Sequence, residues 1–81
     1  GGLTFVITGS LVEYENRGAL KAAIEGAGGK VSGSVSSKTD YLVNNDINST
    51  SGKNKKALEL GIKIIDEATV TRWISQGEIG V

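Results

Sequence analysis

Four residue types are missing altogether from this sequence of 81 residues: cysteine, histidine, methionine and proline. Disulfide frameworks, zinc fingers, thiol nucleophiles and serine–histidine relays are therefore excluded, because each of them needs a cysteine or a histidine. Carboxylates, lysines and hydroxyls are the groups left for chemistry, and no acid–base pair can be recognised among them. We expect a domain that is not itself an enzyme and that has no catalytic residue, no metal site and no cofactor.

Excess charge of one sign and long apolar runs are also absent. Nine Lys and Arg balance nine Asp and Glu, so the formal net charge is zero and no global positive field attracts a polyanion. Any binding of nucleic acid must then come from a local arrangement of charge. No stretch approaches the ~18–20 apolar residues of a membrane span, and the chain opens with two glycines rather than an initiator methionine or a signal peptide. We interpret residues 1–81 as one small domain, cut from a longer protein and without membrane contact.

Short apolar runs rich in β-branched residues alternate with helical patterns along the chain. Residues 3–8 are almost continuously apolar, as in a strand buried on both faces of a parallel sheet. The order βαββαβα favours an α/β domain with a mostly parallel, four-stranded sheet and three helices covering both of its faces. The other strands are predicted at residues 30–32, 41–43 and 63–65, and the helices at 17–27, 53–60 and 66–76.

Each predicted helix has an apolar face and a recognisable start or stop. Asn16 is placed to cap the first helix, and a glycine follows every helix where the chain must turn. Trp73 falls on the apolar stripe of the last helix and is interpreted as a core residue. Residues 44–52 are predicted to form a polar loop. The positions expected to be buried are Leu20, Ala23, Ile24 and Ala27 in the first helix, Ala57, Leu58 and Leu60 in the second, and Val70, Trp73 and Ile74 in the third.

Thr8 and Gly9 stand where the first strand is expected to end. Ligands of open parallel sheets bind outside the carboxyl ends of the strands. Gly9 allows a ligand to approach the backbone closely, and the Thr8 hydroxyl adds a hydrogen-bond donor beside it, which suits an oxyanion. Taken alone, the same two residues also fit an ordinary strand end followed by a turn.

Two of the predicted helices begin with cations, although the positive end of the helix dipole disfavours them. Arg17 opens the first helix and Lys53 the second, with Lys55 and Lys56 close behind, whereas acids at residues 66–67 open the third helix in the usual way. An anion held between the first two helix starts would turn the repulsion into attraction, with Arg17 as a bidentate fork and Lys53 as a point charge. The alternative is a solvated lysine cluster on an exposed helix.

Taken together, the motifs resemble those of a BRCT domain over nearly the whole chain. The resemblance is strongest to the subgroup found in bacterial NAD-dependent DNA ligases and in the large subunit of replication factor C. It implies a four-stranded parallel sheet with one helix on one face and two on the other. The segments that carry it are Phe5-Val6-Ile7-Thr8-Gly9, Arg17 at a helix start, residues 28–43, Lys53 with Lys56-Ala57 and Leu60-Gly61-Ile62, and Trp73.

The resemblance also implies a phosphate pocket. In this family a Ser or Thr and the following Gly after the first strand, with a Lys at the start of the second helix, hold the phosphate, and these match Thr8, Gly9 and Lys53. The subgroup that binds DNA ends adds an Arg at the start of the first helix, which matches Arg17. Lys55 or Lys56 is expected to contact the adjacent DNA backbone.

The expected function is therefore that of a non-catalytic module of a DNA replication or repair protein, such as an NAD-dependent DNA ligase. It would bind DNA at or near a 5′-phosphorylated end and be a monomer when isolated. We expect it in the bacterial cytoplasm with the nucleoid, or in the nucleus if the source is eukaryotic. The alternative is a protein-interaction module that binds a phosphopeptide or docks directly onto a protein partner.

Overall fold

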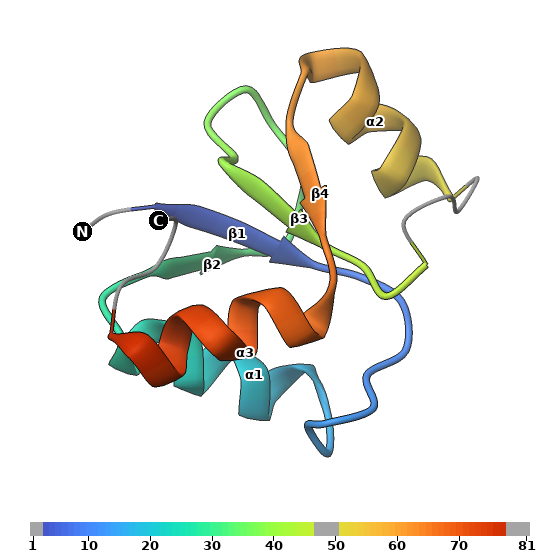
Figure 1. Ribbon diagram of the computed structural model, residues 1–81. Coiled ribbons are helices and arrows are strands. Elements are labelled where there is room, and N and C mark those ends of the chain that lie inside the picture. Colours follow the sequence, from blue (N-terminus) through green and yellow to red (C-terminus); the bar gives the residue numbers. More distant parts are fainter. Residues whose placement is uncertain (1–2, 47–50, 78–81) are drawn as a thin grey trace.

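The computed structural model describes residues 3–46 and 51–77 of the chain (Figure 1). The order βαββαβα predicted from the sequence is confirmed in these residues. The elements are β1 (Thr4–Ile7), α1 (Arg17–Gly26), β2 (Lys30–Ser32), β3 (Tyr41–Val43), α2 (Gly52–Leu60), β4 (Lys63–Ile65) and α3 (Glu67–Gln76).

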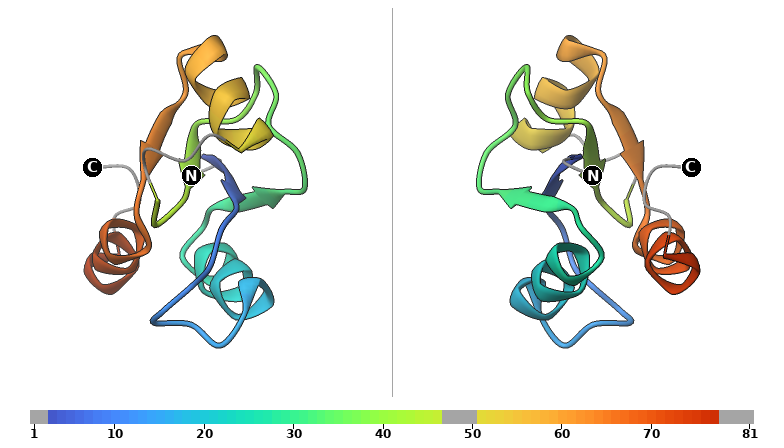
Figure 2. Two further views of the ribbon diagram at one scale, coloured as in Figure 1. Left: turned by 90° about the vertical axis from the view of Figure 1, so that its right-hand side faces the viewer. Right: turned by 90° about the vertical axis from the view of Figure 1, so that its left-hand side faces the viewer.

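The four strands form one parallel sheet in the order β2-β1-β3-β4, as expected for an α/β domain of this kind. The register aligns Ile7 of β1 with Val43 of β3, and Val43 with Ile65 of β4. The carboxyl ends of these three strands therefore lie at the same end of the sheet. Helices α1 and α3 cover one face and α2 covers the other, an arrangement seen in Figure 1 and from both sides in Figure 2.

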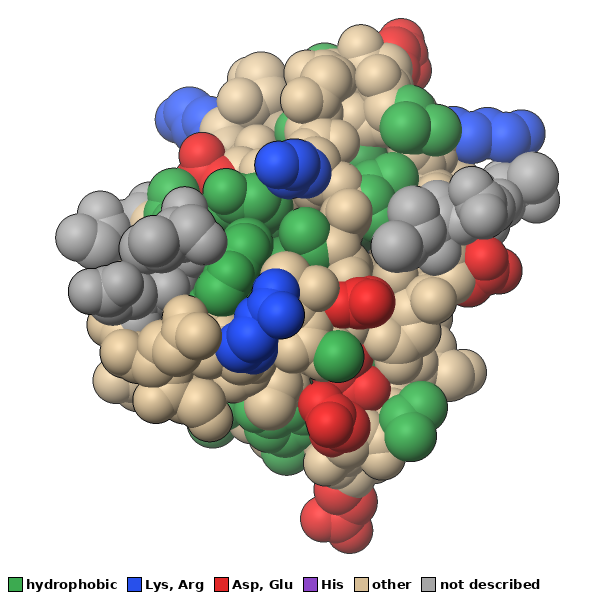
Figure 3. All heavy atoms as spheres, viewed as in Figure 1, with side chains coloured by type: hydrophobic (Ala, Val, Ile, Leu, Met, Phe, Trp, Pro, Cys, Tyr) green, Lys and Arg blue, Asp and Glu red, His purple; other side chains and the backbone are tan. Residues whose placement is uncertain are grey.

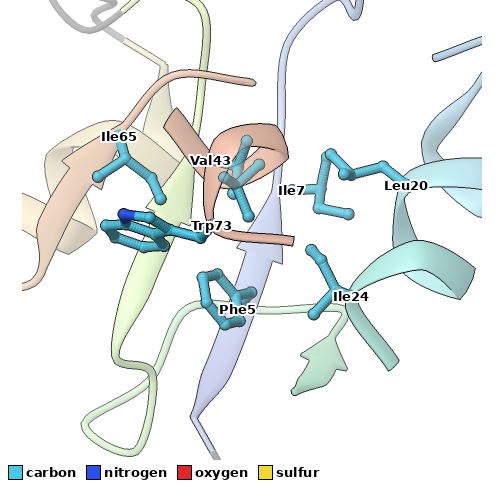
Figure 4. Packing of buried hydrophobic residues seen from close by; sticks show 8 residues of the cluster. Phe5, Ile7, Leu20, Ile24, Val43, Ile65 and Trp73 are labelled. Atoms are coloured by element: carbon cyan, nitrogen blue, oxygen red, sulfur yellow. The ribbon is translucent and has the colours of Figure 1, made fainter. Parts of the chain in front are cut away.

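Alternation along the strands divides the core between the two faces of the sheet, because successive side chains of a strand point to opposite sides. Beneath α1 and α3 lies the larger part, where Trp73 closes one side (Figure 4). Tyr41 stacks on Phe5 with ring centroids 5.4 Å apart and meets Trp73 edge to face at 5.1 Å. The larger cluster comprises Phe5, Ile7, Leu20, Ile24, Val43, Ile65, Val70 and Trp73, and the smaller one, beneath α2, comprises Val6, Leu42, Ala57 and Ile62.

The predicted burial of Leu58 and Leu60 is wrong. Leu58 is 67% exposed and Leu60 is 39% exposed, and α2 instead buries Ala57 together with the polar side chain of Asn54. Leu58 follows Ala57 directly, so it stands about 100° further round the helix. With so few apolar residues in α2, residue type alone did not identify the face that packs on the sheet.

The helix starts and stops follow local rules. Asn16 caps α1 as expected, because its side-chain oxygen accepts a hydrogen bond from the Ala19 N–H at 2.9 Å. Gly61 and Gly77 end α2 and α3 in the left-handed conformation, each with φ of 73°. None of the helices in residues 3–46 and 51–77 has the length and the apolar run needed to span a membrane.

Candidate functional site

The loops that follow β1, β3 and β4 meet at the carboxyl end of the sheet. Thr8 donates its N–H to the carbonyl oxygen of Val43 at 2.9 Å, and Asn44 donates its N–H to that of Ile65 at 2.8 Å. Each strand is thus tied to its neighbour at the residue where the next loop begins. The left panel of Figure 2 faces this end of the sheet, with α2 on one side of the strands and α1 and α3 on the other.

Three cationic side chains surround a hollow beside this end of the sheet, which we call the cationic hollow. Its volume is about 160 Å³. Since a water molecule takes up about 30 Å³ in the liquid, the hollow has room for a phosphate group. It is lined by Arg17, Lys21 and Lys53, and by Ile7, Gly18, Val31, Ser32 and Gly33.

The electrostatics of the cationic hollow favour an anion. Arg17 is the first residue of α1 and Lys53 the second of α2, and neither helix has an acidic residue in its first turn. In contrast, α3 begins with Glu67 behind the cap residue Asp66. Among residues 3–46 and 51–77, no acidic side chain lines the cationic hollow. The predicted placing of two cations at helix starts is confirmed, and the structure brings both of them to one hollow.

Sequence reasoning missed the third cation, Lys21. It lies one helical turn after Arg17, and residues four apart are neighbours on a helix surface. That spacing was the available signal, because two cations on one face of α1 with no acid at its start already indicate a local positive patch. Elsewhere charge is mixed: the face of the molecule in Figure 3 shows acidic and basic side chains scattered among apolar ones.

Thr8 and Gly9 line a second hollow of about 440 Å³, which we call the Thr8–Gly9 hollow. The structure therefore does not bring all of the predicted residues into one pocket. The start of α2 borders both hollows, because Ser51 lines the second and Lys53 the first. Lys56 is exposed one turn further along α2 and lines neither of them. The other residues of the Thr8–Gly9 hollow are Ser10, Val12, Asn44, Asn45 and Asp46.

A pair of buried amides joins the end of the sheet to α2. Asn44 and Asn54 are 2% and 0% exposed, and the Asn44 Nδ2 donates to Asn54 Oδ1 at 2.9 Å. The Asn44 Oδ1 accepts from the Asp46 N–H at 2.9 Å. Because a buried amide is costly unless it is hydrogen-bonded, this pair fixes α2 against the sheet end. The residue pattern around Asn44 indicates only a polar loop and gives no sign of this structural role.

Gly9 fits closely against this amide pair. Its φ is +79°, and a Cβ built on it would lie 2.7 Å from Asn44 Oδ1. Only glycine combines this conformation with so close an approach. Asn44 thus accounts for the glycine at this position, and the expected approach of a ligand to the Gly9 backbone stays a prediction.

We expect the free energy of unfolding of Gly9→Ala to be about 2–4 kcal/mol lower than that of wild type. The added methyl group would clash with Asn44, and alanine would also be strained in the left-handed conformation. The matched control is Gly61→Ala. Gly61 also has a positive φ, of +73°, but a Cβ there meets nothing within 4 Å. Gly61→Ala should therefore lose only the about 1 kcal/mol that the left-handed conformation costs an alanine. Urea unfolding of the two variants measures the difference, and equal midpoints would contradict the clash.

A buried carboxylate organises the loop between β1 and α1. Glu67 is only 2% exposed, and its Oε2 accepts the N–H groups of Glu13 and Tyr14, both at 2.9 Å. Its Oε1 accepts the Val12 N–H at 2.7 Å and the Asn45 Nδ2 at 3.1 Å. The sequence indicated only that Glu67 suits a helix start.

The environment of Glu67 keeps this carboxylate ionised. Burial acts to raise its pKa, but the hydrogen bonds from Val12, Asn45, Glu13 and Tyr14 together outweigh burial, so the pKa lies below the ordinary 4.5. The hydrogen bonds stabilise the charged form because all four donors point at its oxygens. Within residues 3–46 and 51–77, no three acidic side chains are grouped so that they could hold a metal ion.

Comparison with known proteins identifies relatives over most of the chain. The family model for the BRCA1 C Terminus (BRCT) domain matches residues 2–74. A protein named DNA ligase from Lachnoclostridium phytofermentans is 62% identical over 75 residues, which are 93% of this chain and 12% of that protein. DNA ligases from Ruminiclostridium cellulolyticum and Corynebacterium jeikeium are 57% and 47% identical over 93% and 94% of this chain, and over 11% and 10% of their own length.

The chain thus spans about a tenth of the length of these curated relatives. The matched family model covers far more than half of the chain, and the parallel sheet with helices on both faces agrees with the fold that the motifs implied. The chain belongs to the BRCT domain family.

Proposed function

We propose that this BRCT domain is the DNA-end-binding module of a DNA ligase, and that it binds a 5′-phosphorylated end without catalysing a reaction itself. The observation that carries the proposal is the cationic hollow, which is lined by Arg17, Lys21 and Lys53 and by none of the acidic side chains that the structure describes. Relatives named DNA ligase support DNA as the partner.

A phosphate in the cationic hollow would lie near the starts of α1 and α2. There the unpaired N–H groups of the first helical turns add to the positive potential of the three side chains. Arg17 can offer two parallel donors to phosphate oxygens, whereas Lys21 and Lys53 supply charge. Thr8 and Gly9, in the neighbouring hollow, would contact the sugar–phosphate backbone next to the end, and Lys56 would contact it further along.

These contacts carry no base information, so binding should not depend on DNA sequence. It should depend strongly on salt. If the three cations of the cationic hollow neutralise three phosphate charges, affinity falls about 40-fold between 50 and 200 mM salt.

The test is a titration of the domain with a short recessed duplex, with and without its 5′ phosphate, followed by backbone amide shifts. The phosphorylated end should bind about 10–100-fold more tightly, as expected for charge-assisted hydrogen bonds to one group. The shifts should centre on Gly9, Arg17, Lys21 and Lys53. Equal affinity for the two duplexes would overturn the proposal, and displacement of the DNA by a phosphopeptide at similar concentration would favour a phosphoprotein partner.

A further inference from the structure

Glu67 accepts a set of hydrogen bonds that plays no part in the proposed contacts with DNA. It is a charged residue at the start of α3, nearly inaccessible to solvent, and its carboxylate faces a loop rather than a cation. The N–H groups of Val12, Glu13 and Tyr14, three successive residues, all point at it. Successive backbone N–H groups that converge in this way form an anion-binding nest. Here the nest is filled by a carboxylate of the same chain.

Asn45 closes the arrangement from the side of β3. Its Nδ2 donates to Glu67 Oε1 and, at 3.0 Å, to the carbonyl oxygen of Ser10. Its Oδ1 accepts the Glu67 N–H at 2.8 Å. The loop between β1 and α1 is therefore held at Ser10 by Asn45, which follows β3, and at residues 12–14 by Glu67 of α3, while its side chains Leu11 and Tyr14 pack against the larger core cluster.

This loop carries the chain from Gly9 to Arg17. Tyr14 lies only three residues before Arg17, and between them Asn16 caps α1. Leu20 and Ile24 hold α1 on the sheet, and the hydrogen bonds to Glu67 fix the chain just before the first turn of α1, where Arg17 lines the cationic hollow. We propose that Glu67 is a positioning residue of the phosphate site, which touches no ligand but holds the β1–α1 loop so that Arg17 faces the bound phosphate. This inference rests on the proposed function.

The charge of Glu67, and not only its shape, is needed for this task. Both carboxylate oxygens accept hydrogen bonds, two each, and neither can donate. A glutamine has the same shape, but its NH₂ group must face either the Val12 side or the Glu13 side of the nest, where it meets N–H groups. One half of the nest then loses its acceptor.

Glu67→Gln tests the proposal, with Glu59→Gln as the matched control. Glu59 is exposed on α2, so its substitution makes the same change in net charge away from the nest. Two quantities are measured: hydrogen exchange of the amides of residues 12–14 in the free domain, and the ratio of affinities for 5′-phosphorylated and 5′-hydroxyl duplexes. In Glu67→Gln the amides should exchange at least about tenfold faster, and the phosphate preference should fall about tenfold as the Arg17 contact is lost. Glu59→Gln should change neither.

Other outcomes overturn the proposal in distinguishable ways. If the amides of Glu67→Gln exchange faster but the phosphate preference stays, the loop does not position Arg17. If the amides stay protected, the carboxylate does not hold the loop. If wild type itself shows no phosphate preference, the proposed function fails and the positioning role fails with it, while the exchange data still report on the nest. Should Glu67→Gln not fold, Glu67→Asp keeps the charge but shortens the reach, and an unaltered phosphate preference in that variant contradicts the proposal.

Discussion

Replacing Lys53 with glutamate should weaken binding to a 5′-phosphorylated duplex on the order of 100-fold. Lys53 is half-buried where α2 begins, and it shares the cationic hollow with Arg17 and Lys21. The substitution removes a charge-assisted contact and puts a negative charge beside the phosphate. A fluorescence titration at 150 mM salt measures the loss.

The same substitution should leave the fold intact or make it slightly more stable. An acid in the first turn of a helix interacts favourably with the dipole, by about 0.3–1 kcal/mol, whereas the lysine it replaces does not. The thermal midpoint of Lys53→Glu should therefore be equal to that of wild type or a few degrees higher. Affinity for the duplex would thus fall without any loss of stability, which a general loss of structure cannot produce.

Lys63→Glu is the control for this experiment. Lys63 is exposed at the first residue of β4, level with Tyr41 and Phe5 at the amino end of the sheet, so the same change in charge occurs far from the cationic hollow. At 150 mM salt, charges more than about 8 Å apart in solvent are largely screened. Its affinity for the duplex should remain within about threefold of wild type. An equal loss in both variants would show that only net charge matters.

Glu67→Gln should lower the free energy of unfolding at pH 7 by about 3 kcal/mol. The substitution leaves part-buried N–H groups of the β1–α1 loop without an acceptor, and each donor left unpaired away from water costs about 1–3 kcal/mol. For a domain of this size, with a total stability of about 4–12 kcal/mol, that is a large loss. Urea unfolding followed by the fluorescence of Trp73 provides the measurement.

This difference should depend on pH in a defined direction. The pKa of Glu67 is lower in the folded domain than its ordinary 4.5, so the stability that its charge contributes is fully present above pH 4.5 and is lost as the pH falls through the folded value. A protonated carboxyl, like an amide, has a donor where the nest needs an acceptor. The difference in the free energy of unfolding between wild type and Glu67→Gln should therefore become smaller below pH 4.5.

Neighbouring acids do not obscure the comparison. The pKa of Asp66 is also lowered, chiefly by the hydrogen bonds that its side chain accepts from the Thr69 hydroxyl and N–H. Asp66 is present in both proteins, so its contribution cancels in the difference. A gap that stays constant from pH 7 to pH 3 would contradict the role given to the charge of Glu67.

The elements were predictable because their signals are local. A strand such as β1 is visible as a run of apolar and β-branched residues, and the first and last helices show their buried faces in spacings of three and four. In α2 this signal fails, since Asn54 occupies a buried position that an apolar residue would normally mark, while Leu58 is exposed. The cations at the helix starts were also predictable, because helix boundaries and charge are both read along the chain.

The contacts of Asn44 and Glu67, which fix the loops around the site, were not predictable in the same way. Asn44 looks like any residue of a polar loop until Gly9 and Asn54 are placed beside it. Glu67 fits the ordinary pattern of an acid at a helix start, and that pattern gives no sign of a second partner. Such roles depend on which loops meet at the sheet end, and they become visible only in the three-dimensional arrangement.

The contacts of Glu67 also affect when, during synthesis of the chain, the domain becomes able to bind a phosphorylated end. The carboxylate belongs to α3, the last helix of the described chain, and its partners Val12, Glu13 and Tyr14 were made 55, 54 and 53 residues earlier. A nascent chain that has not yet produced α3 already carries Arg17 and Lys53 but lacks the group that fixes the β1–α1 loop. We therefore expect selective recognition of a phosphorylated end to arise only when translation has passed Glu67, so that a chain interrupted before α3 does not occupy the ends that the finished protein needs.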